Sequence, residues 1–327
     1  IRERIGVIQR LLDQCKNTEA TIVFNEGVYA FEKGLKLTAE HKNLTLKGEG
    51  NVRFLGGKEL KNWTKVEGTP IAQRFDPEAR DKIYVCDLEG EGISAVGDFV
   101  SRGFNRYVTP SHSELFCNGS PMNLSQYPKG DGFLQITDVA EGKTNEWDDK
   151  VGSLEGGFYY DDERPARWEP SDQLWTLGYW AWDWANSCEH VEILDTEKKF
   201  IRNYPPYGNY SYIPGQRFRF YHILEEVNQP GDYYIDVKEK KAYIYPEKMD
   251  DSTEITISVM EEPILSLSGS ENIRLEGISF EAVRGDAVAG EYTEGLVIDN
   301  CYFKNIGNYA VDLTEGHNNA VYNSTIH

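Results

Sequence analysis

The sequence predicts an all-β fold: a parallel β-helix, or solenoid, with a helix across its N-terminal end and a β-rich domain inserted between its coils. Three observations predict it. Similar residues recur 23 positions apart near the end of the chain, as with Leu275, Ile298 and Val321. Apolar and polar residues alternate within each repeat, which is the period of a strand. The register disappears between residues 60 and 250. Short strands that stack like on like are typical of a β-solenoid.

Five columns of residues carry the repeat. They are Leu275, Ile298 and Val321; Phe280, Phe303 and Ile326, which Ile257 extends backwards; Gly277, Asn300 and Asn323; Leu265, Val288 and Val311; and Leu267, Gly290 and Leu313. The recurrent Gly or Asn tolerates left-handed backbone angles, so we expect a sharp turn there in each coil. An ordinary β-sandwich with accidental similarity is the alternative.

We predict that residues 1–59 form a helix followed by the first coils of the solenoid. Ile5, Ile8, Leu11, Leu12 and Cys15 follow helical spacing. Tyr29 and Phe31 precede Val52 and Phe54 by 23 residues, and Ile22 and Phe24 precede Leu44 and Leu46 by 22. The first turn of a solenoid exposes strand edges and apolar core, so a helix laid across it would cover both.

Residues 60–250 are too long for an ordinary loop, and we interpret them as an inserted β-rich domain. Its strand-like pieces are Lys82–Cys86, Glu114–Cys117, Phe133–Thr137 and a hairpin of Tyr233–Val237 with Ala242–Tyr245. The coils then continue over residues 251–327. The chain stops at His327 without a polar capping element, so we expect it to be the N-terminal part of a longer β-helix.

Composition excludes several classes of partner. The 54 acidic and 34 basic side chains give a net charge of −20, which argues against binding to nucleic acid or to an anionic membrane. No apolar run approaches the roughly 18 residues that a spanning helix needs, so membrane insertion is not expected. The five cysteines lie far apart without a CxxC pair, so neither a zinc site nor a dense disulfide framework is predicted.

Aromatic and acidic residues crowd into one part of the insertion. Six of the seven tryptophans lie between Trp147 and Trp184. Aromatic faces stack on sugar rings and carboxylates accept sugar hydroxyls, so Trp168, Trp180, Trp182 and Asp183 are candidate substrate-binding residues. The alternative is that they form the core of the insertion.

The segment 159–168 places three adjacent acids beside Arg164, which suits polar recognition. Those acids could also bind calcium, although they lack the spacing of a calcium loop. A solvated charged turn is the alternative.

Carboxylates on the coils are candidates for glycosidase chemistry, which needs one acid and one nucleophile or base. Successive coils lie about 4.8 Å apart, so acids on neighbouring coils can reach the required separations. The candidate catalytic residues are Asp286, Asp312 and Glu315, and His317 is a candidate for substrate binding. No motif of a serine hydrolase, zinc protease or nucleotide-binding protein is present.

Several segments resemble those of large bacterial right-handed parallel β-helix proteins from polysaccharide-degrading systems. These segments are residues 157–168, 177–187 and 229–236, and residues 114–119 with 126–128. They are similar to glycoside hydrolase families 141 and 120, whose β-helix carries an inserted β-domain, and the resemblance covers almost the whole chain. It implies that the insertion forms a wall of the substrate cleft and that the catalytic acids lie on later coils than those present here.

These observations together predict a glycoside hydrolase, secreted or periplasmic, that acts on a plant or host polysaccharide or oligosaccharide through paired carboxylates. No metal or other cofactor is required, although calcium could bind. One alternative is a polysaccharide lyase, which would need basic residues near the substrate. Residues 254–327 contain only Arg274, Arg284 and Lys304, which favours the hydrolase. The other alternative is a non-catalytic glycan-binding protein.

Overall fold

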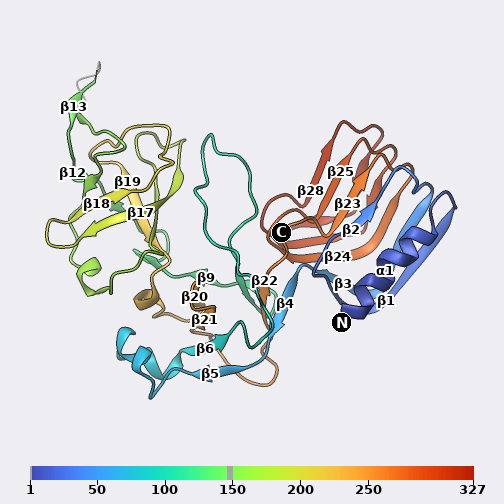
Figure 1. Ribbon diagram of the computed structural model, residues 1–327, viewed down its shortest axis with the longest axis horizontal. Helices are drawn as coiled ribbons and strands as arrows, with labels where there is room; N and C mark the ends of the chain where they lie inside the picture. Colours follow the sequence, from blue (N-terminus) through green and yellow to red (C-terminus); the bar gives the residue numbers. More distant parts are fainter. Residues whose placement is uncertain (1, 146–149) are drawn as a thin grey trace.

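The computed structural model describes residues 2–145 and 150–327 and confirms the predicted fold class. A parallel solenoid stands at one end of the molecule, and the antiparallel strands that interrupt it lie beside it (Figure 1). The first coils and the last coils pack directly together, because β3 pairs in parallel with β24 across the interruption. No helix in the described part of the chain is long and apolar enough to cross a membrane.

The solenoid consists of short strands joined by turns, and each pairs in parallel with its equivalent on the next coil. Its elements are α1 (Arg2–Gln14), β1 (Ala20–Ala30), β2 (Leu35–Leu37), β3 (Leu44–Leu55), β23 (Leu265–Ser268), β24 (Arg274–Val283), β25 (Val288–Glu291), β26 (Val297–Asp299), β27 (Tyr302–Ile306), β28 (Val311–Thr314), β29 (Ala320–Tyr322) and β30 (Thr325–Ile326).

The predicted columns are present in the register of these strands. Leu275 pairs with Ile298, and Ile298 with Val321. The rings of Phe280 and Phe303 stack 5.2 Å apart at an interplanar angle of 7°. The turn column Gly277, Asn300 and Asn323 has left-handed backbone angles, with φ of 66°, 52° and 46°. The repeat therefore follows from stacking inside the core and from sharp turns between strands.

Two details of the predicted register are wrong. Ile257 does not extend the phenylalanine column, because it lies in the antiparallel strand β22 (Ile255–Ser258), and Phe54 pairs with Phe280 instead. In the first coil, Tyr29 pairs with Phe54 and not with Val52, and Ile22 pairs with Leu46 and not with Leu44. The register shifts between Asn25 and Gly27. An offset of two residues keeps the same face inward, so the alternation of apolar residues could not reveal it.

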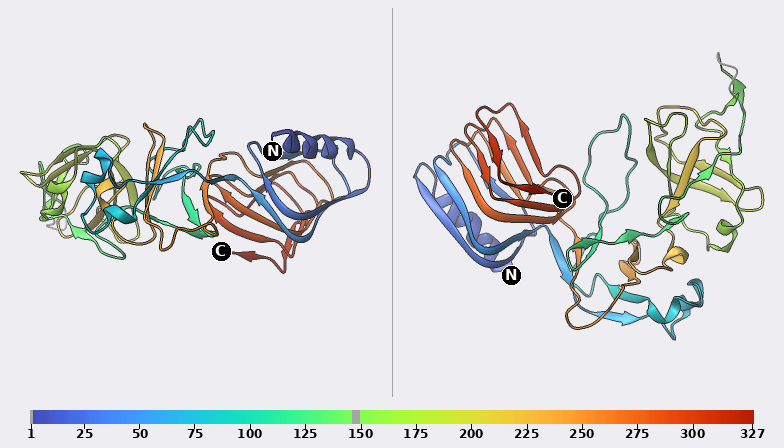
Figure 2. Two further views of the ribbon diagram at one scale, coloured as in Figure 1. Left: turned by 90° about the horizontal axis from the view of Figure 1, so that it is seen from below. Right: turned by 180° about the vertical axis from the view of Figure 1, so that it is seen from behind.

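Helix α1 lies along the first coils (Figures 1 and 2) and closes that end of the core. Ile8 and Leu12 are buried against the solenoid core, whereas Leu11 is exposed. The side-chain amide of Gln9 donates to the Lys36 carbonyl over 3.0 Å and accepts from the Lys36 amide over 2.9 Å. The helix therefore protects both the apolar core and the edge of β2. The side chain of Ile5 lies outside the described residues.

Between Gly57 and Ser258 the described strands pair antiparallel, except for the parallel pair of Asn123–Leu124 with Asp232–Asp236, and we call residues 57–258 the insert. Its outer unit has two sheets, one of β5 (Trp63–Lys65), β6 (Tyr84–Asp87), β21 (Lys241–Ile244), β20 (Asp232–Asp236) and β9 (Asn123–Leu124), and one of β4 (Gly57–Leu60), β22, β7 (Leu115–Cys117) and β8 (Ser120–Pro121). The predicted hairpin is confirmed as β20 and β21. The division into residues 1–59, 60–250 and 251–327 stays a prediction.

The inner unit, so called because it is nested within the outer unit in the sequence, spans residues 126–221 and has a separate apolar core. Its strands are β10 (Gln126–Tyr127), β11 (Leu134–Gln135), β12 (Asp138–Val139), β13 (Lys143–Thr144), β14 (Lys150–Val151), β15 (Phe158–Tyr159), β16 (Trp175–Gly178), β17 (Ser187–Asp195), β18 (Phe200–Asn203) and β19 (Arg217–Tyr221). The 3₁₀ turns η3 (Arg164–Arg167) and η4 (Leu224–Glu226) lie near its junction with the outer unit, whose other 3₁₀ turns are η1 (Pro70–Arg74) and η2 (Arg80–Lys82).

Residues 93–114 form neither helix nor strand, and we call them the interlobe loop. The loop stands between the solenoid and the rest of the insert (Figure 1). Arg284, after β24, donates its Nε to the Ser111 carbonyl over 2.6 Å, and Arg102 donates to the Asn308 side chain over 2.8 Å. These contacts hold the loop against the turns of the solenoid.

Candidate active site

A cavity of about 430 Å³ lies where the interlobe loop, the insert and the solenoid meet. The loop contributes Arg102, His112 and Glu114, the insert contributes tyrosines from β19 and β20, and the solenoid contributes the turn at Gly307. The volume is within the range of roughly 300–1,000 Å³ that small-molecule sites occupy. A cavity at such a junction takes walls from three parts of the chain, so it forms only in the folded protein.

Glu114 has the chemistry of a proton donor. Burial raises the pKa of its carboxyl group, and this effect outweighs the hydrogen bond from Ser111 Oγ to Oε2 (3.2 Å) and the charge of Arg102, which both lower the pKa. A carboxyl group with a raised pKa keeps its proton closer to neutral pH, which is what a general acid needs.

His112 lies beside Glu114 in the same wall. Its ring stacks on Phe99 with centroids 4.0 Å apart, and burial lowers its pKa to about 3. The Tyr233 hydroxyl lies 3.4 Å from His112 Nε2. The imidazole is therefore neutral at physiological pH, so it adds no positive charge that would favour ionisation of Glu114.

The predicted catalytic acids of the solenoid separate into two groups. Asp286, in the turn before β25, accepts a hydrogen bond from the Tyr309 amide over 3.0 Å. Burial and then the nearby charge of Asp312 raise the pKa of Asp286. Glu315 lies in an exposed turn with φ of 53°, and His317 is exposed. The structure thus brings Asp286 and Asp312 together and leaves Glu315 and His317 on an open surface.

None of the tryptophans in the described part of the insert lines this cavity. Trp180 is 2% exposed in the core of the inner unit and donates its Nε1 to Ser187 Oγ over 2.8 Å. The expected substrate contact of Trp180 is therefore wrong, because no face of its ring is available. Trp182 is half-buried, and the exposed Asp183 forms an ion pair with Arg217 over 2.7 Å. Trp147 lies outside the described residues.

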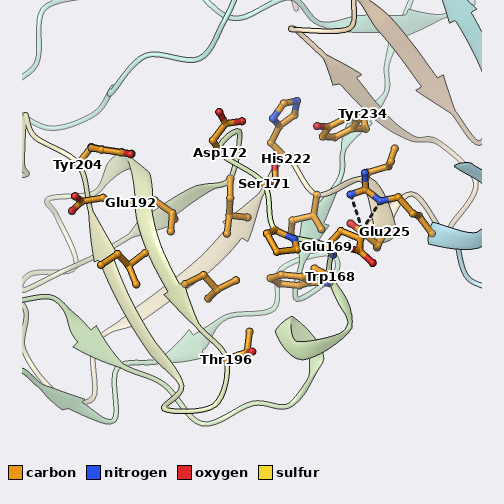
Figure 3. Close-up of a pocket in the computed structure, with 18 residues that line it drawn as sticks. Trp168, Glu169, Ser171, Asp172, Glu192, Thr196, Tyr204, His222, Glu225 and Tyr234 are labelled. Atoms are coloured by element: carbon orange, nitrogen blue, oxygen red, sulfur yellow. Dashed lines mark hydrogen bonds and ion pairs between the residues drawn. The ribbon is translucent and has the colours of Figure 1, made fainter.

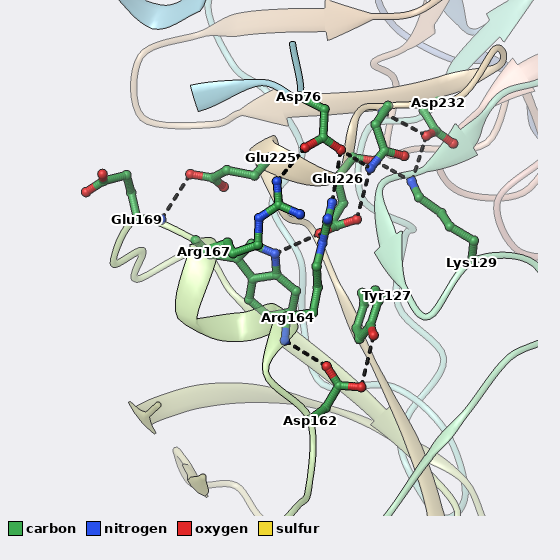
Figure 4. Close-up of polar contacts among 12 residues, drawn as sticks. Asp76, Tyr127, Lys129, Asp162, Arg164, Arg167, Glu169, Glu225, Glu226 and Asp232 are labelled. Atoms are coloured by element: carbon green, nitrogen blue, oxygen red, sulfur yellow. Dashed lines mark hydrogen bonds and ion pairs between the residues drawn. The ribbon is translucent and has the colours of Figure 1, made fainter. Parts of the chain in front are cut away.

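Arg164 and Trp168 join the two units of the insert (Figure 4). Arg164 donates to Glu226 over 2.5 Å and to Asp76 over 3.1 Å. Trp168 Nε1 donates to the same Glu226 oxygen over 2.8 Å. The Glu226 side chain is 1% exposed, so these bonds compensate a buried charge. Arg164 therefore has a structural role in joining the two units, and its contact with a substrate stays a prediction.

The three adjacent acids of this segment already have partners. Asp161 and Glu163 both pair with Lys199, and Asp162 accepts from the Tyr127 hydroxyl over 3.0 Å. Over residues 2–145 and 150–327, no group of three or more metal-ligating side chains is close enough to hold an ion. All five cysteines are free thiols.

Sequence reasoning missed the loop residues Arg102, His112 and Glu114. They follow no period, and the sequence places Glu114 only at the start of a predicted strand and in a segment that carries the family resemblance, without a catalytic role. The available signal was the long stretch without strand character before Leu115, because such loops within a compact domain often carry function.

Comparison with known proteins gives one informative result. No family model matches the chain, and no curated protein matches it. A solved structure named "Glycoside hydrolase" superposes with a TM-score of 0.62 at 13% sequence identity, over 94% of this chain and 58% of that one. The chain therefore spans somewhat more than half the length of this neighbour and shares its fold.

Proposed function

We propose that this chain forms part of a glycoside hydrolase, similar to families 141 and 120, whose substrate cleft lies between the interlobe loop and the solenoid. The substrate is a plant or host polysaccharide or oligosaccharide, and the protein is secreted or periplasmic. The observation that carries the proposal is Glu114, a carboxyl group with a raised pKa in a cavity between two lobes. The structural neighbour named glycoside hydrolase supports it through the fold.

The proposed chemistry needs two carboxyl groups on opposite sides of the substrate. Glu114, on the loop, protonates the oxygen of the leaving sugar. For the second carboxyl group we propose Asp286, on the solenoid, although it does not itself line the cavity. It lies two residues after Arg284, whose Nε donates to the Ser111 carbonyl and whose carbonyl accepts from the Ser111 amide. Its carboxylate acts as nucleophile or activates water, according to the separation of the two groups.

The test is turnover of aryl glycosides and neutral oligosaccharides by the wild-type protein and by Glu114→Gln. Removing a general acid lowers the rate by about 10²–10⁴, while the melting temperature should not fall. Glu239→Gln, at an exposed turn of the insert, is the matched control. An undiminished rate in Glu114→Gln would contradict the assignment. Unsaturated products from an oligogalacturonate assayed in parallel would favour the lyase, and binding without turnover would favour a non-catalytic glycan-binding protein.

A further inference from the structure

A second cavity, of about 540 Å³, lies at the junction of the two units of the insert (Figure 3). Leu174 and Ile223 form part of an apolar wall, the indole of Trp168 forms another side, and Tyr234 and Glu225 contribute polar groups. None of these residues lines the active-site cavity described above. The apolar walls with a few polar groups are typical of a small-molecule site.

Two polar atoms at this cavity, the Tyr234 hydroxyl and Glu225 Oε2, have no hydrogen-bond partner among the described residues. The Tyr234 side chain is 4% exposed, and its ring stacks on His222 with centroids 4.3 Å apart, but no described residue hydrogen-bonds to its hydroxyl. Glu225 Oε1 accepts from Arg74 over 2.8 Å and from the Glu169 amide over 3.0 Å. No described donor reaches Glu225 Oε2. Neither atom is among the fully buried side-chain atoms without a partner in the described part of the chain. Both are therefore open to the cavity and can hydrogen-bond to a molecule that enters it.

The charges around the cavity select the class of ligand. Basic side chains pair three of the four acids that line the cavity: Arg74 pairs Glu225, Arg202 pairs Glu192 over 2.7 Å, and Lys238 pairs Asp172. The fourth acid is the exposed Glu169. The lining therefore keeps a weakly negative balance: it offers a cation only the exposed Glu169, and it disfavours an anion. Paired carboxylates still accept hydrogen bonds from hydroxyl groups.

We propose that this cavity is a saccharide-binding site, separate from the active site, that takes an uncharged sugar. Hydroxyl groups of the sugar hydrogen-bond to Tyr234 and to Glu225 Oε2, and an apolar face of the ring packs against Leu174 and Ile223. A site of this kind would hold a neutral glycan chain on the insert while another part of the chain lies in the active-site cavity.

The test is calorimetric titration of the full chain with cellobiose, xylobiose and lactose, and with digalacturonate as the charged counterpart. Tyr234→Phe removes one hydroxyl without changing the packing. We expect it to weaken binding of a neutral disaccharide by about 2- to 12-fold, the effect of one hydrogen bond, with no loss of melting temperature. Tyr243→Phe is the matched control, because Tyr243 is equally buried on the adjacent strand but lies outside the cavity.

The outcomes separate this site from the proposed activity. Glu114→Gln should bind the neutral disaccharide as the wild type does, even if it abolishes turnover. Equal affinities of Tyr234→Phe and Tyr243→Phe would overturn the proposal, as would binding of digalacturonate as tight as that of the neutral sugars. Absence of binding by all three neutral disaccharides at about 10 mM would overturn it too.

Discussion

Substituting Ile298 by Ala tests whether stacking between coils stabilises the solenoid. Ile298 is fully buried between Leu275 and Val321. The substitution removes three carbons, which cost about 0.8 kcal/mol each on exposure, and the cavity left behind raises the loss to roughly 3–4 kcal/mol. Val321 occupies the same column but is 44% exposed. Val321→Ala should therefore cost only about 1 kcal/mol.

The measurement must separate the solenoid from the insert, because a chain with several cores need not unfold in one step. Urea unfolding followed by circular dichroism gives the total effect, and amide hydrogen exchange in β26 reports the local free energy of opening. Equal losses in Ile298→Ala and Val321→Ala would refute the reasoning, because depth in the stack would then not determine stability.

Three further predictions concern charge and aromatic packing. Burial alone would raise the pKa of Glu281, but its hydrogen bonds, including one from Arg53, hold that pKa below its usual 4.5. The stability that this pair contributes is present above about pH 4.5 and is lost as the pH falls below it. Glu281→Gln should therefore flatten the acid limb of pH-dependent thermal unfolding. Burial raises the pKa of Glu114, so Glu114→Gln should become more stable relative to the wild type as the pH rises above about 4.5, and a constant difference in melting temperature would contradict this. Trp180→Ala should cost about 3–5 kcal/mol in urea unfolding, whereas Trp184→Ala, at a residue 61% exposed, should cost less than about 1 kcal/mol.

The sequence by itself was sufficient for the fold class and for the later coils. Equivalent residues such as Leu275 and Ile298 stack on one another, so one coil of the solenoid corresponds to one repeat in the sequence. The turn residues Asn300 and Asn323 were recognisable for the same reason, since each coil needs a left-handed residue there. Local constraints that recur in every coil leave a periodic record in the sequence.

Only the tertiary structure decided which residues meet at the candidate sites. Trp168 and Trp180 looked alike in sequence, but one borders a cavity and the other is enclosed in a core. Glu114 follows a loop without periodicity and lines a cavity together with the solenoid turn at Gly307. Tyr234 lines another cavity with residues that are distant in the chain. The physical reason is that burial and charge at these sites depend on contacts between distant segments, which occur once in the fold and leave no repeat in the sequence.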